Sequence, residues 1–76
     1  MTKKQIAAIK ANAYVYGYHA EENNGKYMEA LKALHKLIED LYTLTVITRK
    51  QADSIREEIV KSAVEGLNDY RTEHAA

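Results

Sequence analysis

Apolar side chains recur along most of this chain at alternating spacings of three and four residues, which is the period of an α-helix. No proline occurs among the 76 residues, so nothing in the chain forbids a helix. The pattern is interrupted twice, by Asn23-Asn24-Gly25 and by the β-branched run at residues 43–47. It therefore predicts three helices, over about residues 3–22, 26–44 and 48–70.

Three helices joined by short links are typical of an all-α, three-helix antiparallel bundle. We expect one domain, 1–76, because the chain is close to the smallest size at which a single core suffices. Residues 71–76 offer little apolar surface, and we expect them to fray.

The start of the third predicted helix has a recognisable signature. Thr48 and Gln51 have the spacing of a capping box, and Ile47 and Ala52 have the spacing of a hydrophobic staple. We expect the link before this helix to bury Val46 and Ile47.

The helix predicted over 3–22 is apolar on two sides. With 3.6 residues per turn, its two apolar rows lie roughly 150–170° apart. Helices that are hydrophobic nearly all round are normally enclosed, whereas a small three-helix bundle covers one face of each helix. One row is Ile6, Ile9, Ala13, Tyr16 and Ala20, and the other is Ala7, Ala11, Tyr14 and Tyr18, with Ala8 and Val15 beside it.

The second row predicts an interface. Small alanines let another backbone approach closely, and tyrosine is enriched at interfaces because it combines a large area with a hydroxyl group. The alternative is that alanine is simply a good helix former and that the tyrosines lie half-exposed. We expect a homo-oligomer through the first helix, with a two-fold dimer favoured, or another protein partner on the same surface. The predicted interface residues are Ala7, Ala11, Tyr14, Val15, Tyr18 and Arg56.

Two kinds of residue are unusual at their positions inside the predicted helices. Arg56 projects from the apolar arc of the helix predicted over 48–70, so it either covers the bundle edge with its stem or forms an ion pair across an interface. Gly17 and Gly66 lie inside predicted helices, where glycine costs about 1 kcal/mol relative to alanine. We expect Gly66 to permit the close approach of another helix, and Gly17 either to do the same or to weaken the first helix between Tyr16 and Tyr18.

Nothing in the sequence predicts catalysis, a metal site, a cofactor or a small-molecule ligand. His35 and Glu39 stand four residues apart, but they do not belong to a His-Glu-x-x-His pattern. No cysteine is present, no serine has a histidine at matching spacing, and the three glycines form no phosphate-binding loop. We expect a non-enzymatic protein.

The charges balance, because eleven Lys+Arg stand against eleven Asp+Glu, and no excess attracts a nucleic acid or an anionic membrane. A small helix-turn-helix-like DNA-binding regulator is the alternative, since basic residues begin the first and third predicted helices. Acidic residues on the outer faces of the third helix would repel phosphate. The basic residues are Lys3, Lys4, Lys10, Arg49, Lys50 and Arg56, and the acidic ones are Asp53, Glu57 and Glu58.

Targeting signals are absent from the sequence as given. The basic N-terminus is followed by no apolar signal-peptide segment, and no stretch approaches the roughly 20 apolar residues of a membrane span. The lack of cysteine is compatible with a reducing compartment, and we expect a cytoplasmic protein.

The length, the lysine-rich start and the run ITRKQADSIREEI at residues 47–59 show one likeness. In these features the chain resembles the small helical accessory proteins that bacteriophages and prophages encode. The resemblance implies a viral protein in the host cytoplasm that acts by stoichiometric binding, as an inhibitor of a bacterial host or defence protein. It implies no functional residue.

Overall fold

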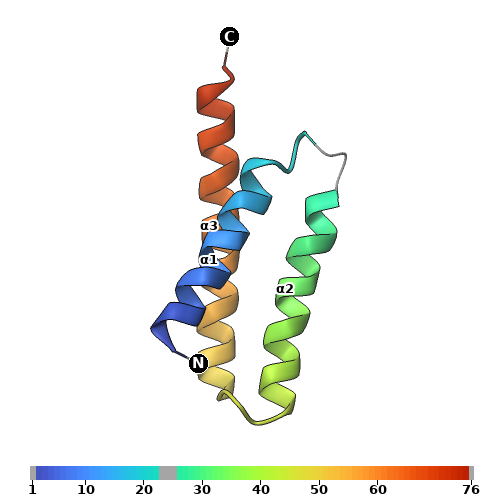
Figure 1. Ribbon diagram of the computed structural model, residues 1–76, viewed down its shortest axis with the longest axis vertical. Helices are drawn as coiled ribbons and strands as arrows, with labels where there is room; N and C mark the ends of the chain where they lie inside the picture. The colour runs from blue at the N-terminus through green and yellow to red at the C-terminus, as the bar shows by residue number, and fades with distance from the viewer. Residues whose placement is uncertain (1, 23–25, 76) are drawn as a thin grey trace.

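Three helices and their connections make up the computed structural model, which describes residues 2–22 and 26–75. The helices are α1 (Lys3–Tyr18), α2 (Lys26–Thr43) and α3 (Arg49–Glu73). Within the described residues no strand occurs. In Figure 1, α1 runs upward, α2 runs downward beside it, and α3 runs upward again. The predicted all-α, three-helix architecture is confirmed.

Two capping boxes begin helices α1 and α3. The backbone N–H of Gln51 donates to the Thr48 hydroxyl at 3.1 Å, and the Thr48 N–H donates to the Gln51 side chain at 2.9 Å. This confirms the predicted signature. Thr2 and Gln5 form the same reciprocal pair at the start of α1, with the same spacing in the sequence.

Helix α1 ends at Tyr18, four residues earlier than predicted. His19 is its C-cap, and the Ala20 N–H turns back to the Gly17 carbonyl at 3.2 Å. Gly17 is the physical reason, because glycine in the final turn lowers helix propensity just where the chain leaves α1. The predicted stop at residues 23–25 lies outside the described residues.

Helix α3 continues to Glu73, so the prediction that it ends at 70 and that all of 71–76 frays is wrong. Polar contacts with Tyr18, the last residue of α1, and with Glu21, which follows the helix, hold its last turn. The Tyr18 hydroxyl donates to Glu73, and the Arg71 guanidinium donates to Glu21 through Nη2 at 2.6 Å and Nε at 2.9 Å. The His74 N–H then closes the helix on the Tyr70 carbonyl.

The link from α2 to α3 closes as a Schellman motif with threonine at the left-handed position. Thr45 has φ 59°, its N–H donates to Tyr42, and the Val46 N–H donates to the Leu41 carbonyl. Ile47 is buried as predicted, but Val46 is 56% exposed, which corrects the prediction. The Val46 N–H is committed to the end of α2, and this places its side chain outside the core that Ile47 enters.

The core lies where the three helices meet, and α1 packs most extensively against α3. Gly17 and Gly66 lie at this crossing. A Cβ on Gly17 would come 1.9 Å from the Ala63 carbonyl oxygen, and one on Gly66 would come 2.1 Å from the Tyr14 carbonyl oxygen. The predicted close approach at both glycines is confirmed. The buried cluster is Ile9, Ala13, Ile38, Ile47, Ala52, Ile55 and Ile59.

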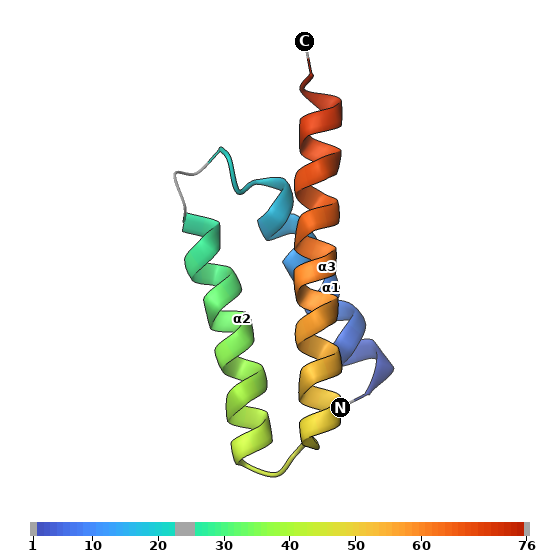
Figure 2. The same ribbon diagram turned by 180° about the vertical axis from the view of Figure 1, so that it is seen from behind.

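Helix α2 is the least enclosed of the three. Only Ile38 is fully buried among its side chains that the structure describes. Both views of the ribbon show α2 joining α3 closely at the 44–48 link and diverging from it toward the other end (Figures 1 and 2). The apolar surface between α2 and its neighbours is therefore incompletely covered.

Candidate protein-interaction surfaces

Tyr14 and Tyr18, two of the predicted interface residues, lie half-buried along α3 of their own chain. The Tyr14 hydroxyl donates to Asp69 Oδ2 at 2.5 Å, and the Tyr18 hydroxyl donates to Glu73. These hydrogen bonds raise the pKa of each phenol from 10.0 to about 12, because an ionised phenolate would lose its donor and face a carboxylate. One role of both tyrosines is therefore to join α1 to α3.

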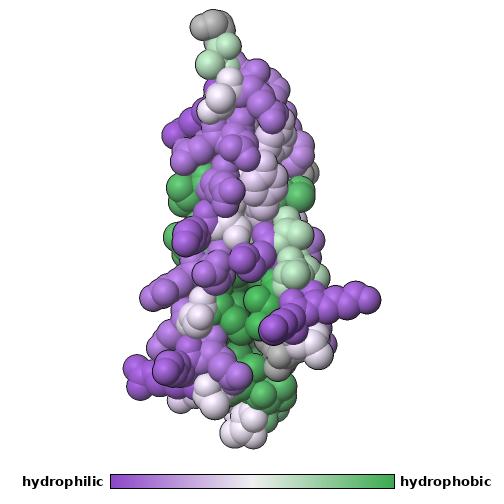
Figure 3. Space-filling view, turned by 90° about the vertical axis from the view of Figure 1, so that its left-hand side faces the viewer, coloured by the Kyte–Doolittle hydropathy of each residue, from purple (hydrophilic) through white to green (hydrophobic). Residues whose placement is uncertain are grey.

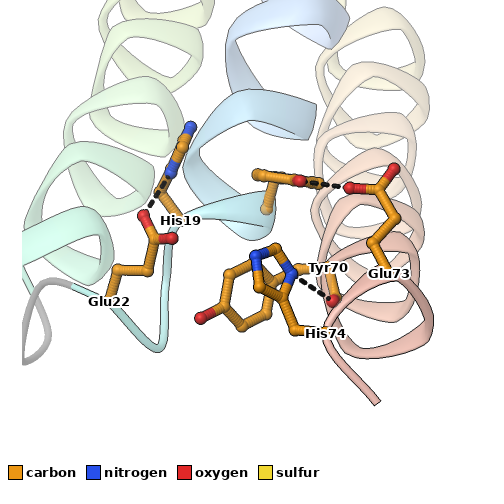
Figure 4. A network of polar contacts seen from close by, with 6 residues as sticks. His19, Glu22, Tyr70, Glu73 and His74 are labelled. Atoms are coloured by element: carbon orange, nitrogen blue, oxygen red, sulfur yellow. Dashed lines mark hydrogen bonds and ion pairs between the residues drawn. The ribbon is translucent and has the colours of Figure 1, made fainter. Parts of the chain in front are cut away.

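Tyr18 also belongs to an aromatic cluster at the C-terminal ends of α1 and α3. Its ring meets Tyr70 edge-on at 5.4 Å and His19 edge-on at 4.9 Å, while Tyr70 stacks on His74 at 4.2 Å. Figure 4 shows His74 turned back toward the Tyr70 carbonyl and His19 toward Glu22. The rings of this cluster pack against one another. That Tyr14 and Tyr18 also contact a second protein stays a prediction.

Three other predicted interface residues, Ala7, Ala11 and Val15, are exposed on α1. Val15 is the largest of them and is 46% exposed. The face over α1 and α3 in Figure 3 is mainly hydrophilic, with hydrophobic atoms gathered in its lower half. Within this chain the outer side of α1 at Ala7, Ala11 and Val15 is thus uncovered, whereas Tyr14 and Tyr18 of the same predicted row lie against α3.

Arg56, the last predicted interface residue, lies half-exposed at the edge between α2 and α3. Its guanidinium Nη1 lies 3.9 Å from Asp53 Oδ1 on the same helix, and Glu39 and Tyr42 of α2 line the same shallow pocket. This position is compatible with either role predicted for Arg56, and its pairing across an interface stays a prediction.

An apolar groove between α2 and α3, here the α2–α3 groove, was not predicted. It has a volume of about 320 Å³, and buried Ile59 and Ala63 lie at its floor. Among the residues that the structure describes, only Lys32 and His35 bring ionisable groups to it. The sequence signal was the width of the apolar face of α3, which two short helices cannot cover. Its apolar walls are Met28 and Leu31 of α2 and Val60, Val64 and Leu67 of α3, and Gly17 and Ala20 at the end of α1 complete its lining.

A second groove, the α1–α2 groove, lies on the other side of α2. It has a volume of about 750 Å³ and includes Leu37, which is 44% exposed, and the exposed Val46. Polar Thr2 and Gln5 contribute to its α1 wall, so its lining is mixed. The remaining lining residues are Ala8, Ile9 and Leu41.

Several ionisable side chains form ion pairs on the surface. His19 Nδ1 lies 2.7 Å from Glu22 Oε2, and Lys10 Nζ lies 3.3 Å from Glu58 Oε2. Across residues 2–22 and 26–75, no group of three His, Cys, Asp or Glu is placed to hold a metal ion. Among the helices described, none is long and apolar enough to cross a membrane.

Comparison of the chain with known protein families, with curated proteins and with solved structures found no match.

Proposed function

We propose that this protein acts by stoichiometric, non-enzymatic binding to another protein, through the α1–α2 groove and the adjoining outer side of α1. The observation that carries the proposal is that large exposed apolar side chains line one groove, the α1–α2 groove, instead of being scattered over the surface. Leu37 and Val46 are both about half-exposed and line the same groove. Contiguous apolar surface of this kind marks interaction sites in folded proteins.

The mixed lining of the α1–α2 groove fits a separable partner. Interfaces between proteins that also exist apart combine an apolar centre with a polar rim. Thr2 and Gln5 supply polar groups at one wall, and Leu37 and Leu41 supply the apolar wall opposite. Predicted interface residues Ala11 and Val15 lie exposed on the same helix as that polar wall.

The test is capture from the native host with tagged protein, followed by measurement of the mass of the isolated complex. We expect one saturable partner, retained by wild type and lost when Leu37→Glu places a charge in the groove. Leu44→Glu is the matched control, because Leu44 is 70% exposed and lies outside the groove lining. A partner that Leu37→Glu still retains would contradict the assignment of this groove.

The DNA-binding alternative receives no specific support from the arrangement of charges. The nearest acidic group to Arg56 is Asp53 on the same helix, and Lys10 pairs with Glu58. Carboxylates beside these cations weaken attraction to phosphate. Titration with duplex DNA at two salt concentrations tests it, and salt-sensitive binding would favour the regulator. The resemblance to phage-encoded inhibitors also stays a prediction, which the captured protein would test.

A further inference from the structure

Charge is unevenly distributed over this protein, although it sums to zero. The 44–48 link forms the lower tip of the molecule in both ribbon views, near the first turns of α1 and α3 (Figures 1 and 2). Residues 2–10 and 40–56, here the link end, contain six of the eleven Lys+Arg and two of the eleven Asp+Glu. The whole-chain balance, from which we expected no attraction to an anionic membrane, therefore does not hold at this end.

Four cations of the link end have no acidic partner. Arg56 lies 3.9 Å from Asp53, and Lys10 lies 3.3 Å from Glu58. Within the part of the chain that the structure describes, the other four form no ion pair, and all four are exposed. Their charge is therefore open to an external anionic surface. The four are Lys3, Lys4, Arg49 and Lys50.

The two most exposed large apolar side chains also lie at the link end. Leu44 is 70% exposed and Val46 is 56% exposed, more than any other large hydrophobic side chain that the structure describes. They flank Thr45 in the link that forms the tip of the molecule (Figure 1). A flat, deformable surface can reach both side chains at such a tip.

The backbone of the link is hydrogen-bonded within the chain. The Thr45 N–H donates to the Tyr42 carbonyl at 3.0 Å, and the Val46 N–H donates to the Leu41 carbonyl at 2.9 Å. The Thr45 hydroxyl donates to the Leu44 carbonyl at 2.7 Å. Backbone polar groups without partners oppose entry into lipid. The link can therefore leave water without breaking these bonds.

We infer that the link end docks on an anionic lipid surface, with Leu44 and Val46 entering the boundary between headgroups and acyl chains. Peripheral membrane binding combines buried apolar area with the attraction of basic residues to anionic lipids, and the link end offers both. Duplex DNA would use the cations through its phosphates and would leave the apolar tip exposed. The inference goes beyond the proposed function and does not rest on it, because lipid vesicles contain no protein partner.

The experiment measures co-sedimentation of the full chain with vesicles of mixed phosphatidylglycerol and phosphatidylcholine. We expect binding that falls as salt rises and that is much weaker with pure phosphatidylcholine. Lys3→Gln/Lys4→Gln should weaken it about thirtyfold, from about fivefold for each basic residue near the surface.

Lys32→Gln/Lys61→Gln is the matched control, because it removes the same charge from exposed helical residues. Both residues lie roughly 17 Å along their helices from the link, beyond the Debye length of about 10 Å at 0.1 M salt. This variant should bind nearly as wild type does.

A second pair of variants tests whether the tip enters the lipid. The chain contains no tryptophan, so Leu44→Trp and Met28→Trp each introduce a single reporter. Met28 is 53% exposed and lies in the first turn of α2, whereas the link follows the last turn. On the anionic vesicles, the emission of Leu44→Trp should shift to shorter wavelength and that of Met28→Trp should not. Leu44→Ser should weaken binding about tenfold or more while circular dichroism shows its helices retained.

Three results would overturn the inference. The first is a wild type that does not bind the anionic vesicles, and the second is an equal loss of binding in the two lysine variants. The third is an unshifted emission of vesicle-bound Leu44→Trp. Tighter binding to duplex DNA, lost in Lys3→Gln/Lys4→Gln and unchanged in Leu44→Ser, would assign the link end to nucleic acid instead.

Discussion

Substituting Gly66 by alanine tests the crossing that organises the fold. At an exposed helix position this change stabilises a protein, because alanine has the better helix propensity by about 1 kcal/mol. At Gly66 the new Cβ would lie 2.1 Å from the Tyr14 carbonyl oxygen and 2.9 Å from the Tyr18 nitrogen. Both atoms belong to the α1 backbone, so no side-chain rotation relieves the contact.

The expected loss in the free energy of unfolding follows from how far the α1 backbone must move away from residue 66. The contact distance has to grow by more than about 1 Å, and an added gap of that size forfeits a quarter to a half of each nearby dispersion contact. Overpacking of a closely packed site costs about 1–3 kcal/mol, and a clash with backbone belongs at the upper end. Subtracting the propensity gain leaves a net loss of about 2 kcal/mol, which lowers the unfolding temperature by about 8–16 °C in a domain of this size.

The assay is urea denaturation followed by circular dichroism, at one protein concentration for all variants. Lys61 provides the control, because it is exposed on the same helix. Lys61→Ala should be more stable than Lys61→Gly by about 1 kcal/mol, the opposite sign to the effect at Gly66. If Gly66→Ala is as stable as wild type, α1 and α3 do not touch through this glycine, and the close crossing of α1 and α3 described above is contradicted.

Three further predictions concern the caps and the tyrosines. Thr45→Gly should stabilise the protein by about 0.5–1 kcal/mol in denaturation, because it relieves a β-branched residue at φ 59°. Thr48→Ala should destabilise it by about 1 kcal/mol through loss of the α3 cap, whereas exposed Thr72→Ala should change little. The folded pKa of Tyr14 and of Tyr18, about 12, lies above the usual 10.0, so their stabilisation is complete below pH 10 and is lost as the pH rises toward 12. Tyr14→Phe/Tyr18→Phe should lack both this loss and the phenol titration component near pH 12.

Local signals in the sequence identified the elements better than their ends. The capping box at Thr48 and Gln51 depends on residues three apart, and the structure contains it as predicted. The end of α3 was misplaced because tertiary contacts set it. Arg71 and Glu73 are helical where they meet the end of α1, and no periodicity in their own segment indicates that contact.

The position of the uncovered apolar surface was harder to predict, and the reason lies in the two glycines. Helical periodicity gives the direction of each side chain around its own axis, but not how closely a neighbour approaches. With no Cβ at Gly17 and Gly66, α3 comes near enough for its carboxylates to reach Tyr14 and Tyr18 on the flank of α1. A neighbouring helix that lies this close covers a wider arc of the surface of α1 than a helix held farther away by larger side chains.

Apolar surface is left over between α2 and α3. The chain has more apolar rows than three short helices can cover among themselves, and the periodicity of the sequence predicted the surplus on α1. Helix α3 closes tightly on α1 at the two glycines, whereas α2 diverges from α3 (Figures 1 and 2), and Val60 and Val64 line a groove there.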